Sequence, residues 1–182
     1  DMRGMLKGLG CPCLYVLRLE TRAEQLMIAN PDFDRFMTAF VLEFTNLRVK
    51  GVAALKSIIA YRSGLDIQPT TESQAAEAFN EVMASQKQTE IPLRLTSKTL
   101  LDYLIVEALN IVSTQNIPVQ FHTALGDTDV DLLKANPLLL KPIFDDQRFR
   151  DVPIVLLHCY PYLKEAAYLT NMYGNAYLDL SM

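Results

Sequence analysis

The chain contains two histidines, His122 and His158. Each follows a segment that has the same pattern: a polar residue, a β-branched residue, a proline and then a mostly apolar run. The segments are Asn116-Ile-Pro-Val-Gln-Phe before His122 and Asp151-Val-Pro-Ile-Val-Leu-Leu before His158. Neutral imidazole is the commonest protein ligand for zinc and similar metals. Two imidazoles at the ends of neighbouring strands therefore predict a shared metal site. The alternative is a pair of histidines that only make hydrogen bonds within their loops.

A lysine and two arginines could bind an anion near these histidines. Lys56 interrupts an apolar segment, and a buried lysine is costly unless it is paired or modified. We therefore expect Lys56 to face a cavity, where it could pair with a carboxylate, bind a substrate anion or bridge metals as a carbamate. Arg18 and Tyr61-Arg62 follow strand-like runs, and arginine suits the recognition of carboxylates. The pattern predicts a small anionic substrate, with structural ion pairs as the alternative.

Further polar side chains follow the histidines along the chain. Asp127 and Asp129 lie in the segment His-Thr-Ala-Leu-Gly-Asp-Thr-Asp. A carboxylate near a metal can accept a proton from metal-bound water, so Asp127 is a candidate catalytic residue together with His158 and Lys56. Short acidic loops are also common on surfaces. Tyr160 is a candidate substrate-binding residue, and simple packing is the alternative for it.

Alternating strand and helix patterns must position these residues. Apolar runs predict strands at 14–19, 51–59, 117–121, 152–157 and 176–180. Apolar residues at helical spacing predict helices at 21–29, 32–47, 72–85, 97–114 and 162–172. This alternation is typical of parallel strands with helical crossovers, and no linker divides residues 1–182, so we expect one α/β domain. Both histidines would lie just past the carboxyl end of a strand, where parallel barrels carry their active sites.

Composition excludes several classes of protein. Half of the 182 residues are hydrophobic, the net charge is −4 and the basic residues are scattered, so we expect a globular protein without a nucleic-acid partner. No apolar run approaches the ~20 residues of a membrane-spanning helix. Cys11, Cys13 and Cys159 form no disulfide framework, which favours a cytoplasmic protein; Cys11 and Cys13 are expected to be ordinary thiols rather than a redox pair or half of a zinc site. The chain lacks an initial Met and stops after a strand-like run, which suggests a fragment of a longer protein.

Four segments together resemble the amidohydrolase-related (amidohydrolase 2) family. The similarity is greatest to its branch of TIM-barrel metal-dependent hydrolases, which also occur fused to glutamine synthetase-like domains. The similarity runs from about Leu14 to the end of the chain. The segments that carry it are Gly51-Val-Ala-Ala-Leu-Lys-Ser-Ile-Ile-Ala-Tyr-Arg-Ser-Gly-Leu65, Val119-Gln-Phe-His-Thr123 with Gly126-Asp127, Asn136-Pro-Leu-Leu-Leu140, and Leu156-Leu-His-Cys-Tyr-Pro-Tyr162 with Glu165-Ala166.

The resemblance implies a fold, a metal site and an activity. The fold would be a distorted (β/α)8 TIM barrel, present here as a partial barrel of about strands 3 to 7. His122 and His158 resemble the metal-binding histidines after the fifth and sixth strands, and Lys56 occupies the fourth strand, where related proteins carry a carboxylated lysine. The family's HxH motif and its later aspartate are absent from this sequence.

The implied activity is hydrolysis of a C–N or similar bond by water that a divalent metal, zinc, activates. A nonoxidative decarboxylase and a noncatalytic barrel that serves as a binding module are the alternatives. The expected partner is a small-molecule substrate, and a homo-oligomer is left open.

Overall fold

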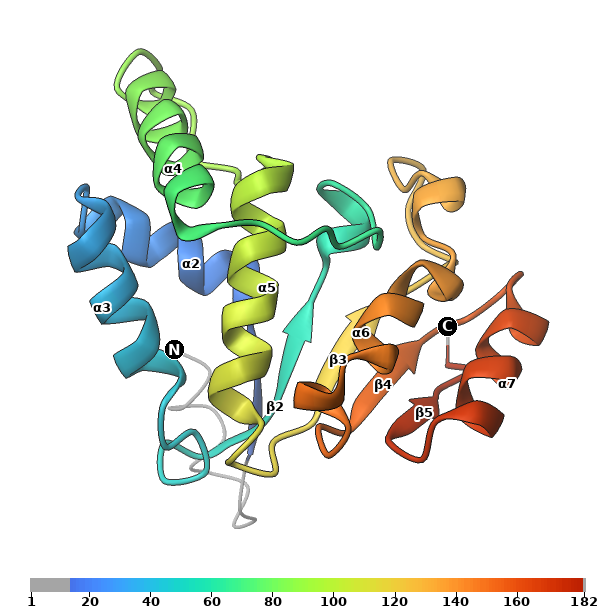
Figure 1. Cartoon of the computed structure of the whole chain (residues 1–182). Helices are drawn as coiled ribbons and strands as arrows, with labels where there is room; N and C mark the ends of the chain where they lie inside the picture. Colours follow the sequence, from blue (N-terminus) through green and yellow to red (C-terminus); the bar gives the residue numbers. More distant parts are fainter. Residues whose placement is uncertain (1–13, 182) are drawn as a thin grey trace, which may run out of the picture.

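The computed structural model describes residues 14–181, so Cys11 and Cys13 lie outside the described residues. Five strands form one sheet in the order of the chain, and every neighbouring pair is parallel (Figure 1). This confirms the predicted α/β architecture with a parallel sheet. The strands are β1 (Tyr15–Arg18), β2 (Val52–Ser57), β3 (Val119–His122), β4 (Ile154–Leu157) and β5 (Ala176–Leu178).

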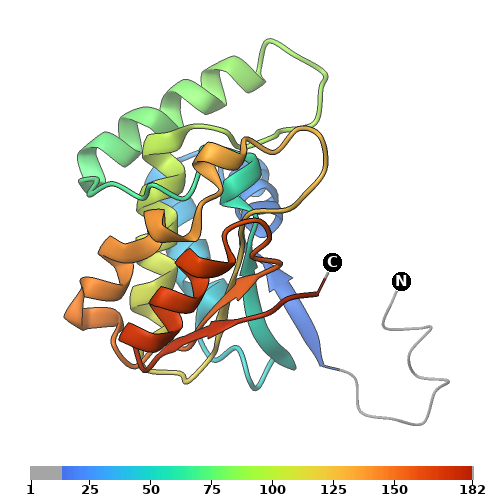
Figure 2. The same cartoon turned by 90° about the vertical axis from the view of Figure 1, so that its right-hand side faces the viewer.

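Helical segments connect each strand to the next and gather on one side of the sheet (Figure 2). Within residues 14–181, no helix covers the other side of the sheet. None of the helices in this range is long and apolar enough to cross a membrane. The α-helices are α2 (Leu19–Ala29), α3 (Phe33–Phe44), α4 (Glu72–Gln86), α5 (Lys98–Val112), α6 (Lys141–Asp145) and α7 (Leu163–Met172), and the 3-10 helices are η2 (Ile59–Tyr61), η3 (Leu132–Lys134), η4 (Pro137–Leu140) and η5 (Gln147–Phe149).

Several element boundaries differ from the predicted ones, and three of the differences lie in segments that contain site residues. Helix α2 begins at Leu19, directly after Arg18, so the first strand is shorter than predicted. Strand β2 ends at Ser57 because the chain turns into η2. His122 is the last residue of β3 rather than the residue after it.

Aromatic and aliphatic side chains on the helices form the core against the sheet. In α3, Phe36, Phe40 and Phe44 recur every four residues, which places them on one helix face, and all three are fully buried. The ring of Phe36 stacks on Phe79 of α4 at 5.0 Å. Asp32 caps α3 by accepting a hydrogen bond from a backbone N–H of the first turn. The apolar periodicity noted in the sequence therefore corresponds to the packed face of this helix.

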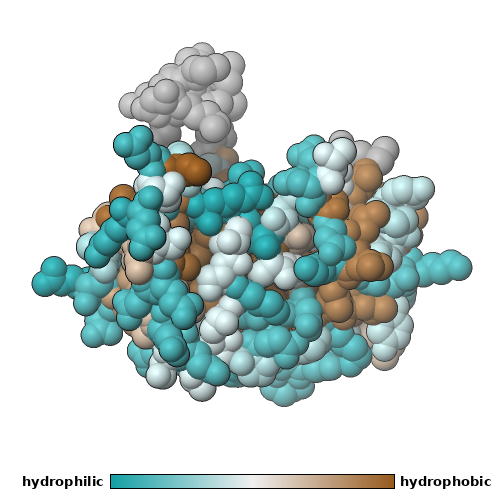
Figure 3. All heavy atoms as spheres, turned by 90° about the horizontal axis from the view of Figure 1, so that it is seen from above, coloured by the Kyte–Doolittle hydropathy of each residue, from teal (hydrophilic) through white to brown (hydrophobic). Residues whose placement is uncertain are grey.

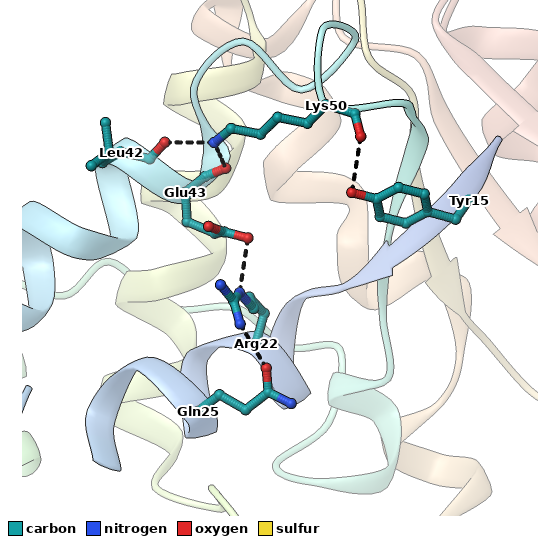
Figure 4. A network of polar contacts seen from close by, with 6 residues as sticks. All are labelled: Tyr15, Arg22, Gln25, Leu42, Glu43 and Lys50. Carbon is teal, nitrogen blue, oxygen red and sulfur yellow. Dashed lines mark hydrogen bonds and ion pairs between the residues drawn. The ribbon is translucent and has the colours of Figure 1, made fainter. Parts of the chain in front are cut away.

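Polar contacts connect α2 with α3, and β1 and α3 with the segment before β2 (Figure 4). Lys50 Nζ donates hydrogen bonds to the carbonyl oxygens of Leu42 and Glu43, which lie in the last turn of α3, at 2.8 and 2.7 Å. The Tyr15 hydroxyl donates to the Lys50 carbonyl at 3.1 Å. Arg22 of α2 pairs with Glu43 at 2.8 Å. Lysine at the end of a helix satisfies carbonyls that have no partner within the helix, so these contacts fix the chain as it enters β2.

Strand register divides the side chains of the sheet into rows that belong to opposite faces, because successive residues of a strand alternate. One row is apolar and belongs to the core between sheet and helices: Leu17, Leu55, Val119, Ile154 and Ala176. The next row lies on the side without helices and contains two cations and an amide: Arg18, Lys56, Gln120, Val155 and Tyr177.

Candidate functional site

A cavity of about 420 Å³ opens at the carboxyl edge of the sheet. Figure 3 looks onto this edge from above, and hydrophilic and intermediate residues occupy its middle, whereas hydrophobic residues gather on one side. The cavity brings together most of the residues that the sequence singled out. Its lining consists of Arg18, Lys56, Ile58, Tyr61, Arg62, Arg94, His122, Asp127, Asp129 and His158.

The two histidines lie side by side in this cavity, as predicted. Their ring centroids are 4.6 Å apart, and the ring planes are inclined by 51°. His122 ends β3 two residues after Gln120, so it shares the face of Gln120 and of its register partner Lys56. Parallel pairing of β3 with β4 brings the carboxyl end of β4, and with it His158, to the same edge.

His158 reaches the cavity through an unusual backbone conformation. Leu157 pairs with His122, so a regular continuation of β4 would direct His158 toward the helices. Instead His158 has a φ of 73° and Cys159 a φ of 63°, which ends the strand. Positive φ is unfavourable for residues other than glycine and is found preferentially at functional sites. The conformation brings the His158 ring beside His122.

One nitrogen of each imidazole makes a hydrogen bond with the backbone, and the second nitrogen is available to bind a ligand. His158 Nδ1 lies 2.8 Å from the carbonyl oxygen of Ser181, to which it donates, and this leaves Nε2 as an acceptor. His122 makes a backbone hydrogen bond with Leu125, while its Nε2 is buried without any hydrogen-bond partner. Metal-binding histidines typically donate one N–H to a carbonyl and bind the ion through the other nitrogen.

Electrostatics keep His122 in the neutral form that binds metals. Its side chain is only 7% exposed. Burial, together with the charges of His158 and Lys56, lowers its pKa to about 4. The Leu125 hydrogen bond and Asp127 act in the opposite direction but are weaker. His122 is therefore uncharged at neutral pH.

Two imidazoles with available nitrogens fit a zinc-type ion as part of its ligand set. No group of three or more His, Cys, Asp or Glu side chains within residues 14–181 comes together as a metal site. A structural zinc has four protein ligands and a catalytic zinc usually has three. His122 and His158 would therefore hold such an ion only with further ligands.

Tyr61 and Gly126 shape the loop beside His122. The Tyr61 hydroxyl accepts a hydrogen bond from the backbone N–H of Asp127 at 2.9 Å, and its ring lies 4.6 Å from the His122 ring. A Cβ atom at Gly126 would come within 2.0 Å of the Tyr61 hydroxyl and 3.0 Å of His122 Nε2. Glycine at this position lets the loop approach both side chains and holds Asp127 at the cavity wall.

The four cations of the cavity differ in their partners. Arg62 Nη1 pairs with Glu24 at 3.1 Å, where both side chains are largely buried, and donates to the Leu95 carbonyl at 3.3 Å. Arg94 lies 3.7 Å from Asp129. Arg18 and Lys56 have no hydrogen bond or ion pair with any residue of the described part of the chain. The charge of Arg62, a predicted substrate-binding residue, is thus neutralised within the protein.

Glu20 makes hydrogen bonds with the end of β2, next to the cavity, and was not among the predicted site residues. Its carboxylate is fully buried and accepts hydrogen bonds from the Ser57 hydroxyl at 2.6 Å and the Ile58 N–H at 2.9 Å. Burial raises the pKa of Glu20, which the two hydrogen bonds partly offset. The one available signal was an acidic residue two positions after Arg18. Glu24 and Arg94 were missed as well, because their partners are remote in sequence.

Tyr160 is the one predicted site residue that the structure does not bring into the cavity. Its side chain is 56% exposed, and it is not part of the cavity lining. The positive φ angles of the two preceding residues turn the chain away from the line of β4. Tyr160 lies two residues after His158 in the sequence, and this proximity does not bring it into the cavity.

No family model matches this chain, but it is similar to a curated protein and to a solved structure. It is 40% identical to protein fluG from Emericella nidulans over 136 residues, which are 71% of this chain and 16% of fluG. A crystal structure from Lactobacillus casei ATCC 334, described as that of a proposed metal-dependent hydrolase, superimposes on all of this chain with a TM-score of 0.88 and 36% identity. The chain spans 47% of that protein. The described α/β fold is thus similar to about half of a protein assigned to the metal-dependent hydrolases.

Proposed function

We propose that this chain is part of a metal-dependent hydrolase of the amidohydrolase superfamily, in the amidohydrolase 2 family, that cleaves a C–N or similar bond of a small anionic substrate. Its fold would be a partial (β/α)8 barrel that corresponds to about strands 3 to 7. The observation that carries the proposal is the buried Nε2 of His122, which has no partner and belongs to a ring 4.6 Å from His158. A buried polar atom without a hydrogen bond is costly, so a ligand is expected to occupy it.

Different residues of this chain would bind the metal, accept a proton and position the proton acceptor at the carboxyl edge of the sheet. His122 and His158 would hold a divalent ion, zinc, together with ligands from parts of the protein outside residues 14–181. Such an ion lowers the pKa of bound water and so supplies hydroxide near neutral pH. The Asp127 carboxylate lines the same cavity and would accept a proton there. Tyr61 positions Asp127 by accepting its backbone N–H.

Metal content tests this assignment in the full-length protein that contains the chain. His122→Ala and His158→Ala should each lower bound zinc at least about tenfold, because each removes one ligand. Tyr160→Phe is the matched control, since it lies near His158 in sequence but outside the cavity, and it should retain the metal. Unchanged metal in both histidine variants would refute the assignment. Release of an amine rather than carbon dioxide from substrates separates a hydrolase from a decarboxylase.

A further inference from the structure

Arg18 and Lys56 form a pair of cations on adjacent strands. They are register partners in the β1–β2 pairing, and both line the cavity. Neither has a hydrogen bond or ion pair within residues 14–181. Like charges directly opposite one another on neighbouring strands destabilise a sheet. A bound anion between the two side chains would remove this repulsion.

The remaining cations of the cavity cannot serve an anion equally well. Arg62 already shares its charge with Glu24, and Arg94 with Asp129. Glu24 also accepts the Leu95 N–H at 2.8 Å, so it is held in place to pair with Arg62. The cavity cations that have no partner within residues 14–181 therefore lie on the β1–β2 side, whereas the two histidines lie on the β3–β4 side.

The spacing between these two sides suits one small molecule. Adjacent strands lie about 4.8 Å apart, so the guanidinium of Arg18 and the ammonium of Lys56 can reach the same oxyanion. His122 lies two residues beyond Gln120, the register partner of Lys56, which is about 7 Å along the strand. An oxyanion at Arg18 and Lys56 would thus be a few bonds from a group at His122.

We propose that Arg18 and Lys56 bind an oxyanion of the substrate that is remote from the hydrolysed bond. The substrate class is then acidic amides, molecules with a C–N bond and a separate carboxylate or phosphate. This inference rests on the proposed function for the reacting bond, but the oxyanion site itself stands on the two unpaired cations. Lys56 is in this assignment a free ammonium and not a metal ligand.

Calorimetric titration of the full-length protein tests the site with three probes: succinate, inorganic phosphate and the neutral succinamide. Lys56→Met and Arg18→Met should each weaken oxyanion binding about ten- to a hundredfold, because each removes a charge-assisted hydrogen bond. Arg94→Met, a cavity-lining cation that already has a partner, should change the affinity less than about threefold. Succinamide should not bind measurably. The tighter of succinate and phosphate identifies the oxyanion as carboxylate or phosphate.

Titrations on both metal-free and zinc-loaded protein separate the two proposals. Oxyanion binding that depends on Arg18 and Lys56 supports the site even if zinc content does not depend on the histidines, which would refute only the proposed function. Equal binding by wild type and both Met variants overturns the site, as does an equal loss in Arg94→Met. Loss of zinc in Lys56→Met would make Lys56 a metal ligand and also overturn it. Arg18→Gln and Lys56→Gln repeat the test if a Met variant fails to fold.

Discussion

At the scale of single residues, the site combines buried polar groups that would each be unfavourable alone. His122 has an unpartnered nitrogen, Glu20 has a buried carboxylate oxygen without a partner, and His158 has a left-handed backbone conformation. Burial of polar atoms without hydrogen bonds and positive φ both cost free energy. All three lie at or beneath one edge of the sheet. This concentration favours a functional origin for the arrangement.

The low pKa of His122 predicts a pH-dependent stability of the metal-free protein. Because its pKa falls from 6.5 to about 4 on folding, the unfolded state binds the proton more tightly than the folded state. The free energy of unfolding should therefore fall as the pH drops from about 6.5 to about 4, by at most about 3 kcal/mol from this residue. Urea unfolding with a chelator at several pH values measures this. His122→Asn should show a flatter dependence; identical curves for both proteins would count against the neutral, buried imidazole.

At the scale of elements, short connections after the strands position the cavity residues. The turn into η2 places Tyr61 beside His122, and the loop after β3 brings Gly126 and Asp127 against Tyr61. Arg62 and Glu24 connect the segment after β2 to α2 and to Leu95. Each connection is fixed by a contact between segments that are distant in sequence. These contacts hold the connecting segments in place around the cavity.

Gly126→Ala tests the packing of the loop after β3. The added Cβ would overlap the Tyr61 hydroxyl, so Tyr61 or the loop must move and the hydrogen bond to Asp127 is lost. We expect a loss of about 1–3 kcal/mol in the free energy of unfolding, which is typical of overpacking. Gly174→Ala is the control, because its Cβ would meet no atom within 4 Å. Equal unfolding midpoints for the two variants would show that the loop yields without cost.

At the scale of the whole molecule, the sheet is covered by helices on one face only within residues 14–181. The uncovered face contains the row of Arg18, Lys56, Gln120, Val155 and Tyr177. In a closed barrel this face would be the interior, filled by side chains from all strands. The proposed (β/α)8 barrel therefore requires further strands of the full-length protein to close over it.

Thiol labelling of the full-length protein tests this closure. Tyr177 is 53% exposed here, and in a closed barrel a thiol introduced by Tyr177→Cys should react at least about a hundredfold more slowly than one introduced by Val49→Cys. Val49 is 90% exposed on the connection before β2 and serves as the accessible control. Peptide mapping separates both from the native cysteines. Similar labelling rates for the two variants would exclude a closed barrel.

The order of the elements and the position of both histidines at one edge of the sheet could be predicted from the sequence, because both follow from local patterns. Apolar periodicity, proline position and strand–helix alternation depend on neighbours in the chain, and they predicted a parallel sheet with both histidines at one edge. Lys56 was placed by a simple physical argument, the cost of an ammonium among apolar helix faces. The exact ends of β1 and β2 were not predicted, because turns and helix starts depend on tertiary contacts.

Only the tertiary structure decided which charges of the site are available. Arg18, Lys56, Arg62 and Arg94 look alike as sequence. In the structure, however, Glu24 forms a buried ion pair with Arg62, and Asp129 lies 3.7 Å from Arg94, and both acidic residues come from distant segments. The left-handed turn that directs His158 into the cavity and Tyr160 away from it has no local sequence signal such as glycine. Ion pairs and strained turns are set by the packing of whole elements, and the sequence around one residue does not contain that information.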